Sequence, residues 1–192
     1  MKLYKLTDQN METHYGFKWE LNKARRIKKC EFPRLCTNDV FHVYKDKNLA
    51  LIMNPIHANI PTPILFEARG NIVVDEWDKA GVFELTLVKE LQYPKWYTSK
   101  YETDILIQFA ILCAEVVLEH FEKYDPKEKR PHKAIEAAKK YLNIKNTAAA
   151  HATAHAAAAA HATAAAAHAA IKIDFARLAK QAIRIIKDKY NE

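Results

Sequence analysis

The sequence predicts an α+β protein. It combines a small antiparallel β-rich N-terminal domain, residues 1–97, with a C-terminal antiparallel bundle of about four helices, residues 98–192. Short β-branched and aromatic runs separated by turn residues fill the first half, which is typical of strands. Apolar residues recur at helical spacing in the second half. There the segment 148–170 holds 17 alanines and neither Gly nor Pro, so it strongly favours a helix.

Composition limits the classes of function. Hydrophobic residues make up 49% and charged residues 28% of the 192 positions, which indicates a globular chain rather than a disordered one. With three glycines and no GxGxxG or GKS/GKT motif, a glycine-rich phosphate loop is not expected. Three cysteines without a CxxC pair fit free thiols in a reducing cytoplasm, and the N-terminus lacks the apolar core of a secretion signal. Four histidines in the alanine segment argue against a membrane span.

Positive charge is the main surface feature. The net charge is +7 and its excess is spread over both halves. One dense cluster stands out, formed by Lys23, Arg25, Arg26, Lys28 and Lys29. Such a cluster can contact an anionic partner, either nucleic acid or an acidic protein. The alternative is a solvated loop.

The first half predicts strands at 2–6, 14–20 and 40–44, with Gly16 as a possible bulge. The runs 64–68, 71–75 and 82–88 predict an antiparallel meander. Residues 48–53 are either a short helix or a strand, and the proline-containing segment 54–63 predicts an irregular loop.

The second half predicts four helices. The first covers residues 101–123, with Ser99 and Glu102 at capping-box spacing, and the second covers 131–142 behind a first-turn proline. The alanine helix follows. The last helix is capped by Asp174 and has an apolar stripe formed by Phe175, Leu178, Ala179, Ala182, Ile185, Ile186 and Tyr190.

Both halves resemble known families. The opening MKLYK, the stretch Gly16-Phe17-Lys18-Trp19, the segment from Cys36 to His42 and LFEARGNIVVDEWDKAGVFELTLV resemble a small uncharacterised domain of phage and bacterial proteins. Val43 stands where that family has a small residue, and its second cysteine is absent. The C-terminal residues Cys113-Ala114-Glu115, the run RPHKAIEAA from Arg130 and the Ala/His segment resemble an alanine-rich helical family of immunity proteins. Lys129 replaces an acidic residue of that family. The resemblance implies binding and neutralisation of another protein.

Several residues have alternative chemical roles. His151 and His155 have the i, i+4 spacing that can present two imidazoles to a metal, although hydrogen bonding within the bundle is the preferred interpretation. A zinc site from Cys30, Cys36, His42 and His57 has no familiar spacing. His42 with the strand glutamates Glu67 and Glu84 faintly resembles an ADP-ribosyl-transfer site.

The favoured hypothesis is a non-enzymatic, protein-binding inhibitor or immunity-type factor of phage or bacterial origin. It has no cofactor and no metal, and it has the capacity to form homo-oligomers through the alanine helix. Its candidate binding residues are Lys23, Arg25, Arg26, Lys28, His42, Arg130, His151 and His155. One alternative is a small nucleotide-binding or ADP-ribosyl-transfer-like enzyme on the β domain. A second alternative is nucleic-acid binding, supported by stacking on the aromatic residues Tyr44, Trp77, Trp96 and Tyr97.

Overall fold

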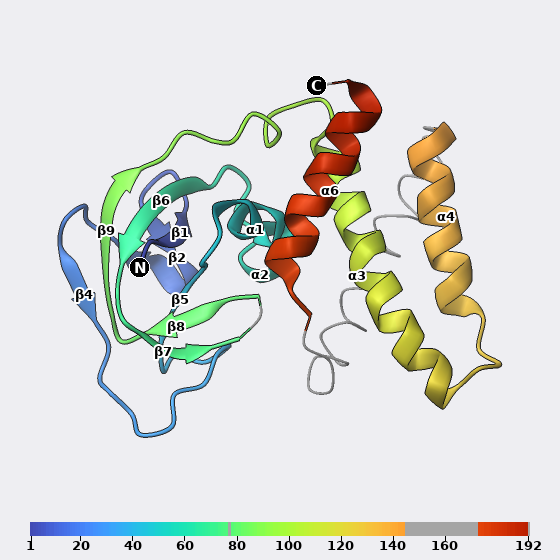
Figure 1. The fold of residues 1–192 in the computed structure, drawn as a ribbon. Helices are drawn as coiled ribbons and strands as arrows, with labels where there is room; N and C mark the ends of the chain where they lie inside the picture. The colour runs from blue at the N-terminus through green and yellow to red at the C-terminus, as the bar shows by residue number, and fades with distance from the viewer. Residues whose placement is uncertain (77, 145–172, 192) are drawn as a thin grey trace. The chain divides into compact units, whose positions relative to one another are not determined.

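The computed structural model of the protein describes residues 1–76, 78–144 and 173–191 (Figure 1). The chain divides into two compact units, Met1–Tyr97 and Thr98–Glu192. Antiparallel sheets make up the first unit and helices the second, so the α+β fold class is confirmed. The alanine helix at 148–170 lies outside the described residues, and so do His151 and His155.

The N-terminal unit contains three antiparallel sheets. The largest has the strand order β1-β6-β9-β4, with β1 at Leu3–Thr7, β6 at Ile64–Arg69, β9 at Glu84–Glu90 and β4 at Ala24–Arg26. The second has the order β5-β8-β7, with β5 at Phe41–Val43, β8 at Ala80–Val82 and β7 at Ile72–Asp75. A small hairpin joins β2 at Glu12–Thr13 to β3 at Phe17–Lys18.

A long hairpin connects the two larger sheets. Its first arm is β6 followed by β7, and its second arm is β8 followed by β9. Because β6 pairs with β9 and β7 pairs with β8, both arms leave one sheet and enter the other, at Gly70 and at Phe83. A Cβ atom at Gly70 would lie 2.6 Å from the carbonyl oxygen of Glu84, so this crossing requires glycine. The predicted three-stranded meander is therefore wrong, because period-2 patterning does not show which sheet a strand joins.

Two further predictions needed correction, and one open alternative is decided in favour of a helix. The predicted strand 14–20 is a strand only at Phe17–Lys18, since residues 14–16 form a hairpin turn in which Tyr15 and Gly16 have φ angles of 60° and 68° in the left-handed region. Residues 48–53 are mostly helical: α1 spans Lys47–Ile52, and the side chain of Asp46 accepts hydrogen bonds from its first amides. The predicted loop 54–63 begins with a short helix, α2 at Asn54–His57, which has a proline in its first turn.

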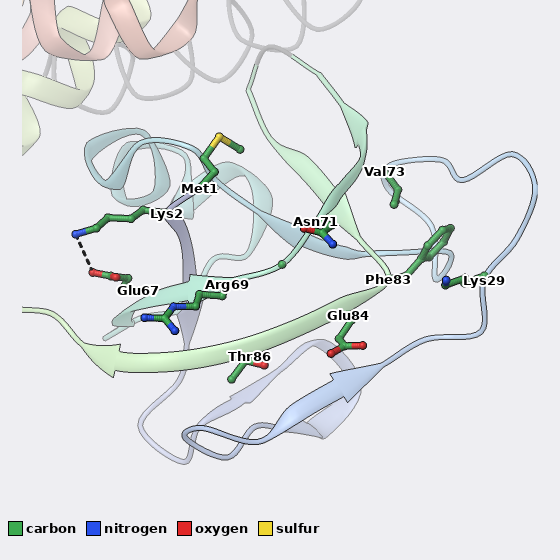
Figure 2. A pocket seen from close by; sticks show the side chains of 11 residues that line it. Met1, Lys2, Lys29, Glu67, Arg69, Asn71, Val73, Phe83, Glu84 and Thr86 are labelled. Carbon is green, nitrogen blue, oxygen red and sulfur yellow. Dashed lines mark ion pairs between the residues drawn. The ribbon is translucent and has the colours of Figure 1, made fainter.

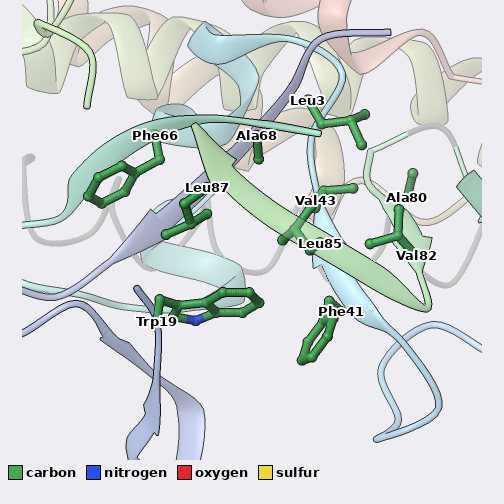
Figure 3. Close-up of a cluster of buried hydrophobic side chains, with 10 residues drawn as sticks. All are labelled: Leu3, Trp19, Phe41, Val43, Phe66, Ala68, Ala80, Val82, Leu85 and Leu87. Carbon is green, nitrogen blue, oxygen red and sulfur yellow. The ribbon is translucent and has the colours of Figure 1, made fainter. Parts of the chain in front are cut away.

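The core of the N-terminal unit lies between its sheets (Figure 3). Side chains from both larger sheets meet there around one indole ring. The cluster consists of Leu3, Trp19, Phe41, Val43, Phe66, Ala68, Ala80, Val82, Leu85 and Leu87. Trp19 packs edge-on against Phe41 with ring centroids 4.9 Å apart, and its Nε1 donates a hydrogen bond to Thr13 Oγ1 at 2.9 Å. The indole is thus buried and its only polar atom is satisfied.

The C-terminal unit has three described helices: α3 at Glu102–Tyr124, α4 at Arg130–Ile144 and α6 at Phe175–Tyr190. Helix α3 packs against both others. All three were predicted, but the capping box was not found, because Ser99 Oγ accepts from the Tyr101 amide at 3.2 Å instead. Asp174 caps α6 as predicted, accepting from the Arg177 amide at 2.9 Å. None of the helices in the described ranges is long and apolar enough to cross a membrane.

Candidate protein-binding surface

Part of the basic cluster forms an edge strand, and Lys28 and Lys29 lie in the exposed segment that follows it. Ala24–Arg26 is β4, the last strand of the four-stranded sheet, paired antiparallel with β9. The Ile27 amide donates a hydrogen bond to the Phe83 carbonyl at 2.8 Å. In an antiparallel pair every second residue bonds to the neighbouring strand, so this bond shows which residues of β4 bond to β9. The backbone groups of Ala24 and Arg26 therefore point away from β9, toward a side that no described strand occupies. We call Lys23, Arg25, Arg26, Lys28 and Lys29 the basic edge.

Two carboxylates neutralise part of the basic edge. Glu20 forms ion pairs with Lys23 at 2.9 Å and with Arg25 at 3.6 Å. Glu84 pairs with Arg26 at 2.6 Å. Hydrogen bonds from Lys23 and from Arg26 lower the pKa values of Glu20 and Glu84, so both carboxylates are ionised. Five cations thus face two paired anions, and a net positive charge remains.

A shallow hollow of about 820 Å³ lies beside the basic edge (Figure 2). Lys29, Arg69 and Asn71 contribute polar groups to its lining, and β9 contributes Glu84 and Thr86. Neither Lys29 nor Arg69 has an ion-pair partner among the residues that the structure describes. The hollow therefore extends the positive surface onto the outer face of the sheet.

Both strand glutamates that were considered for an ADP-ribosyl-transfer site form ion pairs. Glu67 lies between two lysines, with Lys2 at 3.5 Å and Lys89 at 3.7 Å. Glu84 is held by Arg26, as described above. Each carboxylate therefore balances cations of its own sheet, and this arrangement matches the alternative interpretation of outward-facing strand residues.

His42 lies apart from the basic edge, in a half-buried polar cluster. Its Nε2 accepts a hydrogen bond from the Cys36 amide at 2.9 Å, and its carbonyl oxygen accepts one from Lys5 Nζ at 2.8 Å. Burial, followed by the charges of Lys5 and Lys79, lowers the pKa of His42 to about 4. His42 is therefore neutral near pH 7 and supplies no cation to a binding surface.

Lowering the pH from about 6.5 to about 4 should destabilise the N-terminal unit. In the unfolded chain His42 has its ordinary pKa of 6.5, so the unfolded state binds a proton at a higher pH than the folded state does. The stabilisation is complete above pH 6.5 and lost as the pH falls to about 4. Because the ring is partly exposed, we expect a loss of about 1–2 kcal/mol.

Urea denaturation at several pH values measures this loss. His42→Gln keeps a neutral acceptor for the Cys36 amide and should flatten the pH dependence. His14→Gln, at an exposed histidine, is the matched control and should leave the dependence unchanged. Equal acid sensitivity of the His42→Gln variant and the wild-type chain would contradict the assignment.

A second histidine in the same region is tied to a carboxylate and a phenol. His57 Nε2 lies 3.2 Å from Asp78 Oδ2, and its Nδ1 lies 2.8 Å from the Tyr44 hydroxyl. Burial raises the pKa of Tyr44 above its ordinary range. Burial alone would raise the pKa of Asp78, but the hydrogen bond and charge of His57, with the charge of Lys79, outweigh it and lower that pKa. Asp78 is therefore an anion.

The residues of the considered zinc site are not gathered around one point. Cys36 approaches His42 through its backbone amide, while His57 faces Asp78 and Tyr44. Within residues 1–76, 78–144 and 173–191, no three His, Cys, Asp or Glu side chains come close enough to hold a metal ion.

Arg130 lies in the C-terminal unit, at the first residue of α4. Glu128 accepts a hydrogen bond from the Arg130 amide at 2.7 Å and pairs with its guanidinium at 2.6 Å. This pair closes the start of α4, where an acidic side chain is favoured by the helix dipole. His132 and Lys139, further along α4, pair with Glu122 and Glu115 of α3 at 2.9 Å and 2.6 Å. Of the described candidate residues, the basic edge and His42 thus lie at separate places in the N-terminal unit, and Arg130 belongs to the C-terminal unit.

The described helices of the C-terminal unit also carry excess positive charge. Helix α4 has four cationic side chains and one acidic one, and α6 has five cationic side chains and one acidic one. On α6 the exposed positions include Arg177, Lys180 and Arg184. Helix α3 has the opposite balance, with five acidic side chains and one lysine, so the excess positive charge of the described helices comes from α4 and α6.

Residues 97–191 match the family model described as Imm-5 like putative immunity protein. The C-terminal unit is therefore similar to this family. This match confirms the resemblance drawn from the Cys113-Ala114-Glu115 stretch and the RPHKAIEAA run, and it indicates an immunity-type role. The N-terminal unit precedes the Imm-5-like match. The chain matches no curated protein and no solved structure.

Sequence reasoning missed the groups that only the tertiary fold brings together. Arg69 lies between the predicted runs 64–68 and 71–75 and was given no role there. Lys79 lies between the predicted runs 71–75 and 82–88 and was given no role there, but the structure places its ammonium 3.0 Å from Cys36 Sγ. No local pattern could show this contact, because the two residues are 43 positions apart.

Proposed function

We propose that the protein is an immunity-type factor that acts without catalysis, by binding and neutralising another protein through an acidic surface of that partner. The Imm-5-like match over residues 97–191 is the observation that carries the proposal. The positive surface would provide the attraction to the partner. A partner with a complementary acidic patch would be drawn to it and held in a fixed register.

The basic edge has the form of an interaction site. It presents outward-facing backbone groups of β4 together with cations that are only partly neutralised. An extended acidic segment of a partner can satisfy both, by pairing with the strand and by approaching Lys28 and Lys29. The charge of the edge also discourages nonspecific pairing with uncharged strands.

The two alternative functions receive less support. For nucleic acid, Tyr44 and Trp96 are 7% and 3% exposed, so neither ring is available to stack on bases. For a nucleotide-binding enzyme, Glu67 and Glu84 are already held in ion pairs. A thermal-shift series with NAD and nucleotides tests the enzyme directly, since a ligand at 100 times its Kd stabilises by about 2.7 kcal/mol.

Reversing two unpaired charges of the basic edge should weaken binding to the partner. The double variant Lys28→Glu/Lys29→Glu changes exposed side chains that form no ion pair among the described residues, so the fold should be retained. We expect the Kd for the partner to rise by about tenfold or more, and the loss to shrink at high salt. Lys47→Glu/Lys95→Glu, an equal reversal at exposed sites outside the basic edge, should have little effect.

The measurement has two stages. Crosslinking of the wild-type chain in cell lysate and mass spectrometry identify the partner, and calorimetry with the purified partner then gives the Kd of each variant. Co-expression tests neutralisation, because growth inhibition by the partner should be relieved by wild-type protein and less by the double variant. Turnover or tight binding of a nucleotide, with no protein partner recovered, would overturn the proposal.

A further inference from the structure

A thiol and a buried ammonium meet at the edge of the polar cluster around His42. Cys36 is exposed, whereas Lys79, the residue directly before β8, is only 8% exposed. Lys79 Nζ donates a hydrogen bond to Cys36 Sγ at 3.0 Å. Within the described part of the chain this is the only hydrogen bond of the ammonium, and no carboxylate lies within ion-pair distance of it. Asp78 and His42 influence it only at longer range.

A buried ammonium with a single sulfur acceptor is poorly compensated. Charged groups taken out of water require partners of opposite charge or several hydrogen bonds. A neutral thiol is a weak acceptor, so Lys79 keeps donor capacity that points at Cys36. An oxygen atom or negative charge on this sulfur would provide the missing acceptor.

The backbone holds Cys36 in an unusual conformation above Lys79. Its φ angle is 61°, in the left-handed region that non-glycine residues seldom adopt. Its amide donates to His42 Nε2, and Thr37 Oγ1 donates to the Arg34 carbonyl at 2.8 Å within the same loop. Strained positions of this kind are concentrated at functional sites, and here the strain fixes where the sulfur lies.

The other two cysteines lack this environment. Cys30 is also exposed but has no hydrogen bond or ion-pair contact within the described residues. Cys113 is buried in α3, and burial raises the pKa of its thiol to about 12. The chain therefore carries two internal reference thiols, one exposed and one buried.

We propose that Cys36 is a site of reversible oxidation by hydrogen peroxide, with Lys79 as its positioning residue. The Cys36 sulfur, as thiolate, attacks one oxygen of the peroxide. An S–O bond forms and the O–O bond breaks, the sulfur is oxidised by two electrons, and the hydroxide that leaves takes up a proton to become water. Lys79 donates a hydrogen bond to the oxygen that the sulfur has gained. An external thiol reverses the reaction by condensing with the sulfenic acid, releasing water and giving a mixed disulfide that a second thiol reduces.

Sulfenic-acid trapping tests the proposal on the full chain. The protein is treated with dilute hydrogen peroxide and dimedone, and each cysteine-containing peptide is quantified over time by mass spectrometry. Cys36 should be labelled about tenfold faster than Cys30, and Cys113 should stay unlabelled. Lys79→Met should slow labelling of Cys36 about tenfold, whereas Lys79→Arg, which keeps the cation, should restore most of the rate.

The controls separate the role of Lys79 from a general effect on folding. Lys95→Met removes an exposed lysine elsewhere in the N-terminal unit and should leave all three rates unchanged. The comparison of Cys36 with Cys30 in the wild-type chain needs no variant at all. Equal labelling of Cys30 and Cys36 in folded wild-type protein, or an unchanged Cys36 rate in a folded Lys79→Met variant, would overturn the proposal.

Discussion

Replacing Trp19 with alanine should lower the free energy of unfolding of the N-terminal unit by about 3–5 kcal/mol. The indole is 2% exposed and lies at the centre of the core cluster, against Phe41 and Phe17 at centroid distances of 4.9 Å. Removing the ring loses the free energy of its transfer out of water. It also leaves a cavity in the core, because the surrounding side chains of the two sheets can fill the space only in part. Since small units are stable by only about 5–15 kcal/mol, this loss is a large fraction of the total.

Denaturant unfolding followed by circular dichroism measures the change. Trp19→Phe keeps an aromatic ring in the site and gives up only the Nε1 hydrogen bond to Thr13 and part of the volume, so its cost should be clearly smaller. Tyr15→Ala, at an 87% exposed ring in the neighbouring turn, is the matched surface control. A Trp19→Ala variant as stable as the Tyr15→Ala variant would mean that the indole is not a core residue.

The strands of the N-terminal unit were predictable to different degrees. The runs at 2–6, 40–44 and 64–68 were recognised because alternation and β-branching are local signals. The division of 82–88 at Phe83 was not, since the run has no glycine or proline to mark the crossing between sheets. Gly70 is required because the carbonyl oxygen of Glu84 lies too close for a side chain at position 70. This contact joins distant parts of the chain, so the sequence alone does not show it.

The helices of the C-terminal unit were easier to predict. Ile135, Ala138 and Leu142 recur at helical spacing in α4 and are buried, as the pattern indicates. The capping box failed because its spacing occurs by chance as well as at helix starts, and α3 begins at Glu102 itself. Boundaries are thus less predictable than the helices they belong to.

Only part of the candidate surface could be predicted from the sequence. Five cations in seven residues, from Lys23 to Lys29, were an obvious cluster, but composition did not show that three residues of it form a sheet edge. His42 was selected for its type and for the resemblance around it. Its neutral state follows from burial and from the charges of Lys5 and Lys79, which come from distant parts of the chain.

The second large effect is expected in the C-terminal unit. Phe175, the first residue of α6, is 1% exposed, and its ring centroid lies 6.3 Å from that of Phe109 in α3. Ala179 and Ala182 are fully buried, so α6 can approach α3 closely, and Phe175 supplies a large apolar side chain to the contact. Phe175→Ala should therefore cost about 3–5 kcal/mol, and Phe175→Leu much less.

Hydrogen–deuterium exchange read by peptide connects this variant with Trp19→Ala. If the two compact units fold independently, Phe175→Ala should raise exchange in peptides from α3 and α6 and leave those from β6 and β9 unchanged. Trp19→Ala should do the reverse, and the two effects should add in the double variant. Loss of protection in both units from either single change would instead show one cooperative structure.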